Sequence, residues 1–119
     1  METLEQRKAQ RYKMQLPLEI LQLGEQRLRR TEQTRDISSG GVCFLSSNAI
    51  EPGGRIEYVI TLSGSNPPVR IRCLGKVLRS KKPGTEAPFE IAVTMERYSF
   101  VRPGELDQVA NSAHTTLTQ

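Results

Sequence analysis

The sequence predicts an all-β fold, a six-stranded antiparallel β-barrel with a short C-terminal helix and a flexible N-terminal arm. Apolar and polar residues alternate through most of the chain, which is the periodicity of half-buried strands. Clusters of Gly, Pro and Ser interrupt this alternation at short intervals, as turns do. Only 36% of the 119 residues are hydrophobic, and a small closed barrel needs little more than one layer of inward side chains.

Six segments are predicted to be strands. In the first, Leu16, Leu18 and Ile20 share one face, and the shift of phase after Ile20 indicates a bulge or a strand end. The second is polar and fits an edge strand or a half-solvated one. In chain order, we expect strands at residues 16–23, 27–37, 42–45, 56–62, 69–77 and 89–95.

The two ends of the chain differ from this middle part. Residues 1–15 are polar and lack an apolar stripe, which indicates a flexible or partly helical arm. The barrel is expected over 16–103. Residues 104–119 are expected to form a short helix, which could cap one barrel end, and a frayed tail, because Leu106 and Val109 follow Pro103-Gly104 at helical spacing.

Composition excludes several classes of function. The chain has a single histidine, His114, and two cysteines, which argues against a zinc site and against a Ser-His-Asp triad or a Cys-His dyad. We therefore expect that the protein is not an enzyme and that it binds no metal and no cofactor. No apolar run reaches the roughly 20 residues of a membrane span, and the first residues lack the apolar middle of a signal peptide. With two cysteines too few for a disulfide framework, we expect a cytoplasmic protein without membrane insertion. The net charge of +4 favours an anionic partner.

The first candidate site is a pair of arginines in the arm, Arg7 and Arg11. They would lie on one face of a helix, or about 13 Å apart in an extended segment. Each guanidinium is a planar fork of donors that matches a phosphate or the O6 and N7 acceptors of guanine. The alternative interpretation is a solvated helix face.

The second candidate is the segment Asp36-Ile37-Ser38-Ser39-Gly40-Gly41, where a strand enters a turn. The Asp36 carboxylate can accept from the N1–H and N2–H donors of guanine, and the Ser38 hydroxyl both donates and accepts. A glycine at position 41 or 40 permits a positive φ and the close approach of a ligand. The alternative interpretation is an Asx or Ser turn before a strand.

Together these two segments resemble the motif of the PilZ domain, the bacterial receptor module for cyclic di-GMP. Arg7 and Arg11 fit its Arg-x-x-x-Arg half, and Asp36, Ser38 and Gly41 fit its Asp/Asn-x-Ser-x-x-Gly half. The segments 52–60, 75–80 and 89–95 also resemble later strands of that family, so the likeness covers roughly residues 6–100.

The resemblance implies a six-stranded barrel with a C-terminal helix, and a ligand on the barrel surface under the arm. It implies that Arg7 and Arg11 bind phosphates and guanine edges, that Asp36 and Ser38 contact a guanine, and that Gly41 shapes the turn. Two further arginines, Arg35 and Arg79, are candidates for added positive charge near the ligand.

The expected function is therefore that of a cyclic di-GMP receptor, a monomer or weak dimer in which the ligand orders the arm over the barrel. The arm begins almost at the first residue, so we expect a stand-alone member that signals through an unidentified downstream protein, in motility or biofilm formation. One alternative is a PilZ-like interaction module, for example in pili or motility, without nucleotide binding. A basic barrel that binds nucleic acid ranks lower, because few aromatic residues are left for stacking. Scattered carboxylates such as Glu51 and Glu90 are interpreted as surface charge.

Overall fold

The computed structural model describes residues 10–62, 64, 66–102 and 104–105. Eight strands make up this part of the chain: β1 (Tyr12–Lys13), β2 (Pro17–Leu23), β3 (Gln26–Ser38), β4 (Gly41–Ser46), β5 (Arg55–Leu62), β6 (Val69–Lys81), β7 (Phe89–Thr94) and β8 (Arg97–Phe100). The predicted all-β class is confirmed. The predicted C-terminal helix falls almost entirely on residues outside the described ones.

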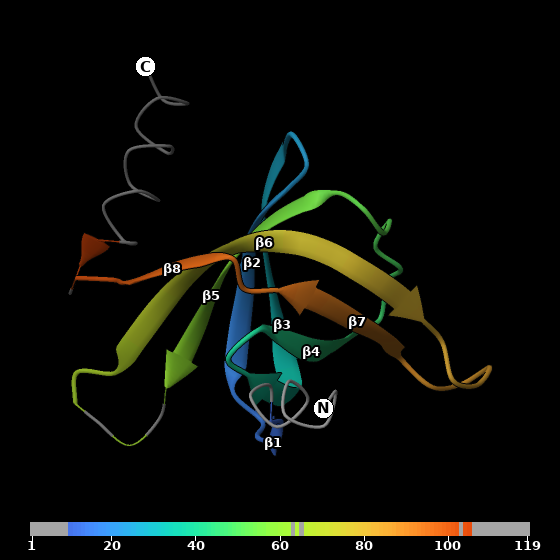
Figure 1. Ribbon diagram of the computed structural model, residues 1–119, viewed down its shortest axis with the longest axis horizontal. Coiled ribbons are helices and arrows are strands. Elements are labelled where there is room, and N and C mark those ends of the chain that lie inside the picture. Colours follow the sequence, from blue (N-terminus) through green and yellow to red (C-terminus); the bar gives the residue numbers. More distant parts are fainter. Residues whose placement is uncertain (1–9, 63, 65, 103, 106–119) are drawn as a thin grey trace, which may run out of the picture.

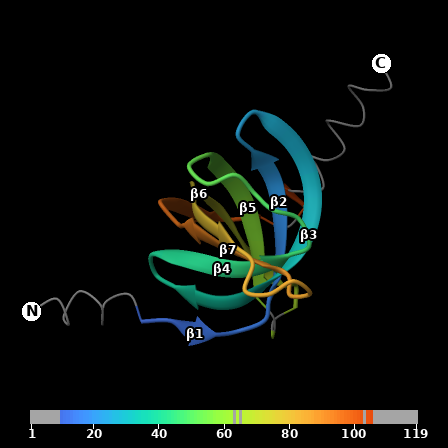
Figure 2. The same cartoon turned by 90° about the vertical axis from the view of Figure 1, so that its right-hand side faces the viewer.

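Six of the strands close into a barrel (Figures 1 and 2). They follow one another in the order β3-β2-β5-β6-β7-β4, and β4 pairs again with β3. Every pairing is antiparallel. The six-stranded antiparallel barrel predicted from the sequence is thus confirmed.

Two strands were not predicted, and the structure decides between the two alternatives given for the polar strand. The additional strands are β1, which pairs with β3, and β8, which pairs with the N-terminal half of β6. The polar strand β3 is not an edge strand, because β2 and β4 lie on its two sides. It is half-solvated instead: its side chains alternate between buried and more exposed positions in its second half.

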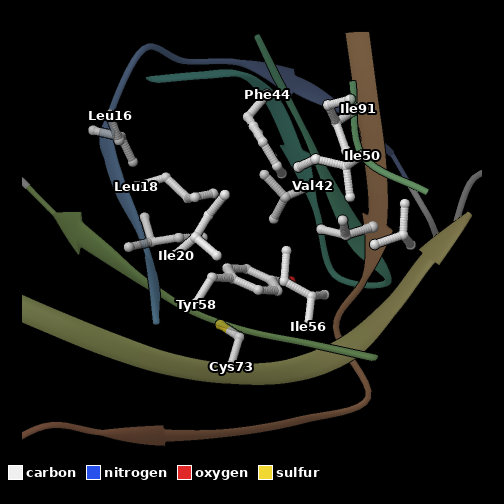
Figure 3. Close-up of a cluster of buried hydrophobic side chains, with 13 residues drawn as sticks. Leu16, Leu18, Ile20, Val42, Phe44, Ile50, Ile56, Tyr58, Cys73 and Ile91 are labelled. Carbon is white, nitrogen blue, oxygen red and sulfur yellow. The ribbon is translucent and has the colours of Figure 1, made fainter. Parts of the chain in front are cut away.

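The core is formed by the apolar side chains that the strands direct inward (Figure 3). Leu18 and Ile20 are fully buried, as their alternation predicts, and Phe44 and Tyr58 fill much of the centre. The Tyr58 hydroxyl donates a hydrogen bond of 3.0 Å to the backbone oxygen of Thr94, so its polar end has a partner. The core cluster consists of Leu16, Leu18, Ile20, Val42, Phe44, Ile50, Ile56, Tyr58, Ile60, Cys73, Val77, Ile91 and Val93.

Three irregularities in pairing interrupt the strands. The one between Ile20 and Gln22 confirms the bulge that the sequence indicated. The others lie in β3 between Thr34 and Asp36, and in β6 between Val77 and Arg79. A bulge inserts one unpaired residue and changes the direction of the side chains around it. The consequence in β3 is that Arg35 and Asp36 both lie on the outside of the barrel, next to each other in space.

Both cysteines, Cys43 and Cys73, are free and buried. No helix in the part of the chain that the structure describes is long and apolar enough to span a bilayer.

Candidate ligand-binding site

The two candidate segments of the sequence meet at the β1–β3 pairing. Lys13 lies opposite Asp36, and Tyr12 lies opposite Ile37. This register brings Arg11 beside Asp36, and its Nη1 donates to Asp36 Oδ1 at 2.8 Å across 25 positions of sequence. The structure therefore brings Arg11 and Asp36 together. Arg7 lies outside the described residues.

A buried hydroxyl fixes the chain between β1 and β2. Thr34 is 1% exposed. Its Oγ1 accepts a hydrogen bond of 2.8 Å from the Leu16 backbone N–H and donates to the Met14 carbonyl oxygen. The Met14 N–H in turn donates to the Arg35 carbonyl oxygen at 3.2 Å. A buried polar group whose hydrogen bonds are all satisfied keeps the surrounding backbone in one conformation. These bonds therefore set the position from which Arg11 reaches Asp36.

The Asp36 carboxylate is shared between two arginines. Oδ1 accepts from Arg11, and Oδ2 accepts from Arg35 Nε at 3.0 Å. Arg35 also reaches β7, where its Nη1 lies 2.7 Å from Glu90 Oε2. The hydrogen bond to Asp36 is the main reason why the pKa of Arg35 is raised. The side chain of Asp36 is only 8% exposed, whereas those of Arg11 and Arg35 are 44% and 41% exposed. Both guanidinium groups are therefore fixed on one side and open to solvent on the other.

The strand register continues this arrangement across the barrel wall. Asp36 on β3 lies opposite Cys43 on β4, Cys43 opposite Ala92 on β7, and Ala92 opposite Arg79 on β6. Opposed residues of antiparallel strands point to the same face. The two small residues in the middle are nearly fully buried although neither belongs to the core cluster, and burial raises the pKa of the Cys43 thiol.

We call this region the arginine surface: Arg11, Arg35, Asp36, Arg79 and Glu90 around Cys43 and Ala92. Arg79 is exposed and lies on it, placed on the outside by the bulge in β6. A role for Arg79 in binding stays a prediction. Glu90 is the residue that sequence reasoning missed. Only the β3–β4–β7 register, which no local motif encodes, brings its carboxylate to Arg35.

Ser38 and Gly41 form the turn that joins β3 to β4. The Ser38 hydroxyl accepts a hydrogen bond from the Gly40 N–H at 3.2 Å and donates to the Gly41 carbonyl oxygen at 3.3 Å, which is a Ser turn. The expected positive φ at position 40 or 41 is wrong, because neither glycine is among those with positive φ. Gly41 is required for another reason: a Cβ atom there would collide with the backbone oxygen of Val93 in β7. Ligand contacts by Ser38 and Gly41 stay predictions.

Comparisons with known proteins agree with the fold. A family model described as PilZ domain matches residues 5–108. Among solved structures, the chain is similar to the Bacillus subtilis inhibitor of motility (MotI/DgrA), with a TM-score of 0.63 and 16% sequence identity. The match covers 95% of this chain and 52% of that one, so the chain spans about half the length of this structural neighbour. Comparison with the curated proteins gave no match.

Proposed function

Because the chain belongs to the PilZ domain family, whose members are binding and adaptor modules, we propose that it is a cytoplasmic receptor for cyclic di-GMP that signals to a partner protein. The observation that supports this proposal is the 2.8 Å contact between Arg11 and Asp36. It joins the two halves of the family motif on the outer surface of the barrel. A dianionic bis-guanylate requires both a cationic fork and an acceptor for guanine donors, and this pair supplies them in one place.

The arrangement suits phosphate binding because Asp36 fixes the guanidinium groups without covering them. A guanidinium has five N–H donors, and the structure shows Arg11 using one of them, at Nη1, for Asp36. Its remaining donors can form charge-assisted, bidentate bonds to a phosphate. We propose the same role for Arg35, whose Nε is bonded to Asp36. Each Asp36 oxygen has two lone pairs, so the carboxylate can accept from a guanine as well.

We further propose that the ligand orders the N-terminal arm over the arginine surface. Arg11 follows Arg7 by four positions, and the pairing of β1 with β3 anchors the chain just beyond Arg11. Fixing the arm costs about 1–2 kcal/mol of backbone entropy per residue, so the affinity is expected to be moderate. A partner that prefers the ordered arm then shifts the population toward the bound state.

The process that this receptor controls is also a proposal. The structural neighbour is by its title an inhibitor of motility. We propose motility and biofilm output as the processes to test first.

Titration calorimetry with cyclic di-GMP, cyclic di-AMP and GTP tests the receptor function. Of these three nucleotides, wild type is expected to bind only cyclic di-GMP. Arg11→Ala should bind at least about tenfold more weakly, because hydrogen bonds to charged groups contribute about 1.5–3 kcal/mol. Arg27→Ala is a matched control, an exposed arginine at the other end of β3. Unchanged affinity in both Arg7→Ala and Arg11→Ala would count against the proposed clamp. If wild type shows no detectable binding to any of the three nucleotides, an interaction module without nucleotide binding is favoured instead.

A further inference from the structure

The strand β8 leaves one edge of the sheet open. It pairs with residues Ile71–Leu74 of β6, and no other described strand pairs with it. Figure 1 shows β8 running beside the N-terminal half of β6, away from β4 and β7. An edge strand presents a row of unpaired backbone N–H and C=O groups, which is a template for a further strand. This edge is distinct from the arginine surface, which uses β3, β4, β7 and the other half of β6.

One face of β8 is aromatic. Tyr98 and Phe100 lie opposite Cys73 and Ile71, and they are 64% and 66% exposed. Tyr98 and Phe100 are thus cross-strand neighbours of side chains at the edge of the barrel core, but they lie outside the closed part of the barrel. Two adjacent exposed aromatic side chains on an edge strand are unusual for a surface without a partner.

The opposite face of β8 is basic. Arg97 lies opposite Leu74, and Ser99 lies opposite Arg72. Together with Tyr98 they line an open hollow of about 290 Å³. Arg72 is paired with Glu57, but among the described residues the structure shows no ion pair for Arg97. This face therefore carries the positive charge of Arg97, although Glu57 and Glu96 line a neighbouring hollow with it. We call β8 with Arg72 and Leu74 the β8 surface.

We propose that the β8 surface is the docking site for an extended acidic segment of a partner protein, which adds to the sheet as a strand beside β8. Main-chain hydrogen bonds to the free edge would supply affinity, and alternate side chains would supply specificity. Neighbouring strands share their faces. The segment must therefore alternate, with acidic residues on the side of Arg97 and apolar residues on the side of Tyr98 and Phe100.

Charge complementarity favours this occupant over a second copy of the chain. Pairing of two β8 strands would bring the Arg97 side chains of both copies onto one continuous sheet, where like charges repel. A single-stranded nucleic acid could use the aromatic rings and the arginines. It would leave the backbone groups of the β8 edge unpaired.

The test is an NMR titration of the isotopically labelled chain with a capped eight-residue peptide in which Glu alternates with Val. We expect chemical-shift changes centred on the amides of Arg97–Phe100, with saturation below millimolar concentration. A peptide in which Lys replaces Glu should leave these amides unchanged. Arg97→Glu should weaken binding of the acidic peptide at least tenfold, and Phe100→Ala should weaken it severalfold. Both side chains are exposed, so both variants should keep the thermal stability of wild type.

The matched control is Arg27→Glu, which reverses an exposed charge on β3 and should leave peptide affinity unchanged. The proposal is overturned if the Lys peptide binds equally well, if the acidic peptide leaves the Arg97–Phe100 amides unmoved, or if Arg97→Glu has no effect. It is also overturned if the same amides respond to oligo-dT but not to the peptide, or if the free chain dimerises through β8. None of these outcomes depends on nucleotide binding, so the result is independent of the receptor function.

Discussion

Glu90 is expected to compete with the ligand for Arg35, so that Glu90→Gln binds cyclic di-GMP more tightly than wild type. In the structure Arg35 Nη1 lies 2.7 Å from Glu90 Oε2, on the arginine surface where a phosphate is proposed to bind. A glutamine keeps the shape of the side chain and removes its charge. The substitution therefore frees a donor of Arg35 and also removes a repulsive charge from the site.

The magnitude follows from the exposure of the ion pair. The side chains of Arg35 and Glu90 are 41% and 28% exposed, so solvent screens their attraction. Exposed pairs of this kind contribute about 0.2–1 kcal/mol. Release of that energy, with the loss of repulsion, corresponds to a dissociation constant that is about two- to fivefold lower.

Calorimetry on three further variants isolates the effect. The matched control is Glu57→Gln, which should bind like wild type. Glu57 pairs with Arg72 on the outer face of β5 and β6, away from the arginine surface. In an Arg35→Ala background, Glu90→Gln should increase affinity much less, because Glu90 then has no Arg35 side chain for which to compete with the ligand. Weaker binding in Glu90→Gln would refute the reasoning and would indicate that Glu90 orients Arg35 for the ligand.

Three further predictions concern stability and are measured by urea unfolding. Gly41→Ala should cost about 1–3 kcal/mol because its Cβ collides with β7, whereas Gly40→Ala, which has open space, should stay within about 0.5 kcal/mol of wild type; equal effects would contradict the steric explanation. Leu18→Ala, at a fully buried core position, should cost about 2–5 kcal/mol, and a smaller loss would place Leu18 outside the core. Burial raises the pKa of Cys73 from 9.0 to about 12, so the unfolded thiol ionises first. Its contribution to stability is then complete below pH 9 and falls by about 1.4 kcal/mol per pH unit between pH 9 and about pH 12. Cys73→Ala should flatten this alkaline slope, and an unchanged slope would exclude the thiol as its cause.

Alternation of apolar residues predicted four of the six barrel strands, β2, β5, β6 and β7, because each has one face in the core. Leu16, Leu18 and Ile20 show this directly. The polar strand β3 and the short apolar strand β4 carry no such alternation. The strand β8 does alternate, with Tyr98 and Phe100 on one face, but it has only four residues and all of them are exposed, so this short alternation was not recognised as a strand. The strand β1 is only two residues long and is held by its register with β3. Strands that owe their existence to a neighbouring strand cannot be recognised from their own residues.

The candidate site divides in the same way. Arg11 and Asp36 could be proposed as partners because each lies in a short motif with a defined chemistry, and the structure places them in contact. The Arg35–Glu90 pair depends on the register of three strands, and no local pattern contains that information. Gly41 was interpreted from its residue type alone. A glycine needed for close packing and a glycine needed for positive φ look identical in a sequence, and here the packing against β7 decides.

The bulges in β3 and β6 make the arginine surface depend on the number of residues in each strand as well as on their identity. Arg35 is the unpaired residue of the bulge in β3, so loss of its codon would let β3 and β4 pair regularly, with Thr34 still opposite Phe44 and Asp36 still opposite Cys43. The deletion would remove the second arginine that holds Asp36 and the carbonyl oxygen that accepts from the Met14 N–H. Loss of the unpaired residue of a bulge should therefore damage ligand binding more than folding.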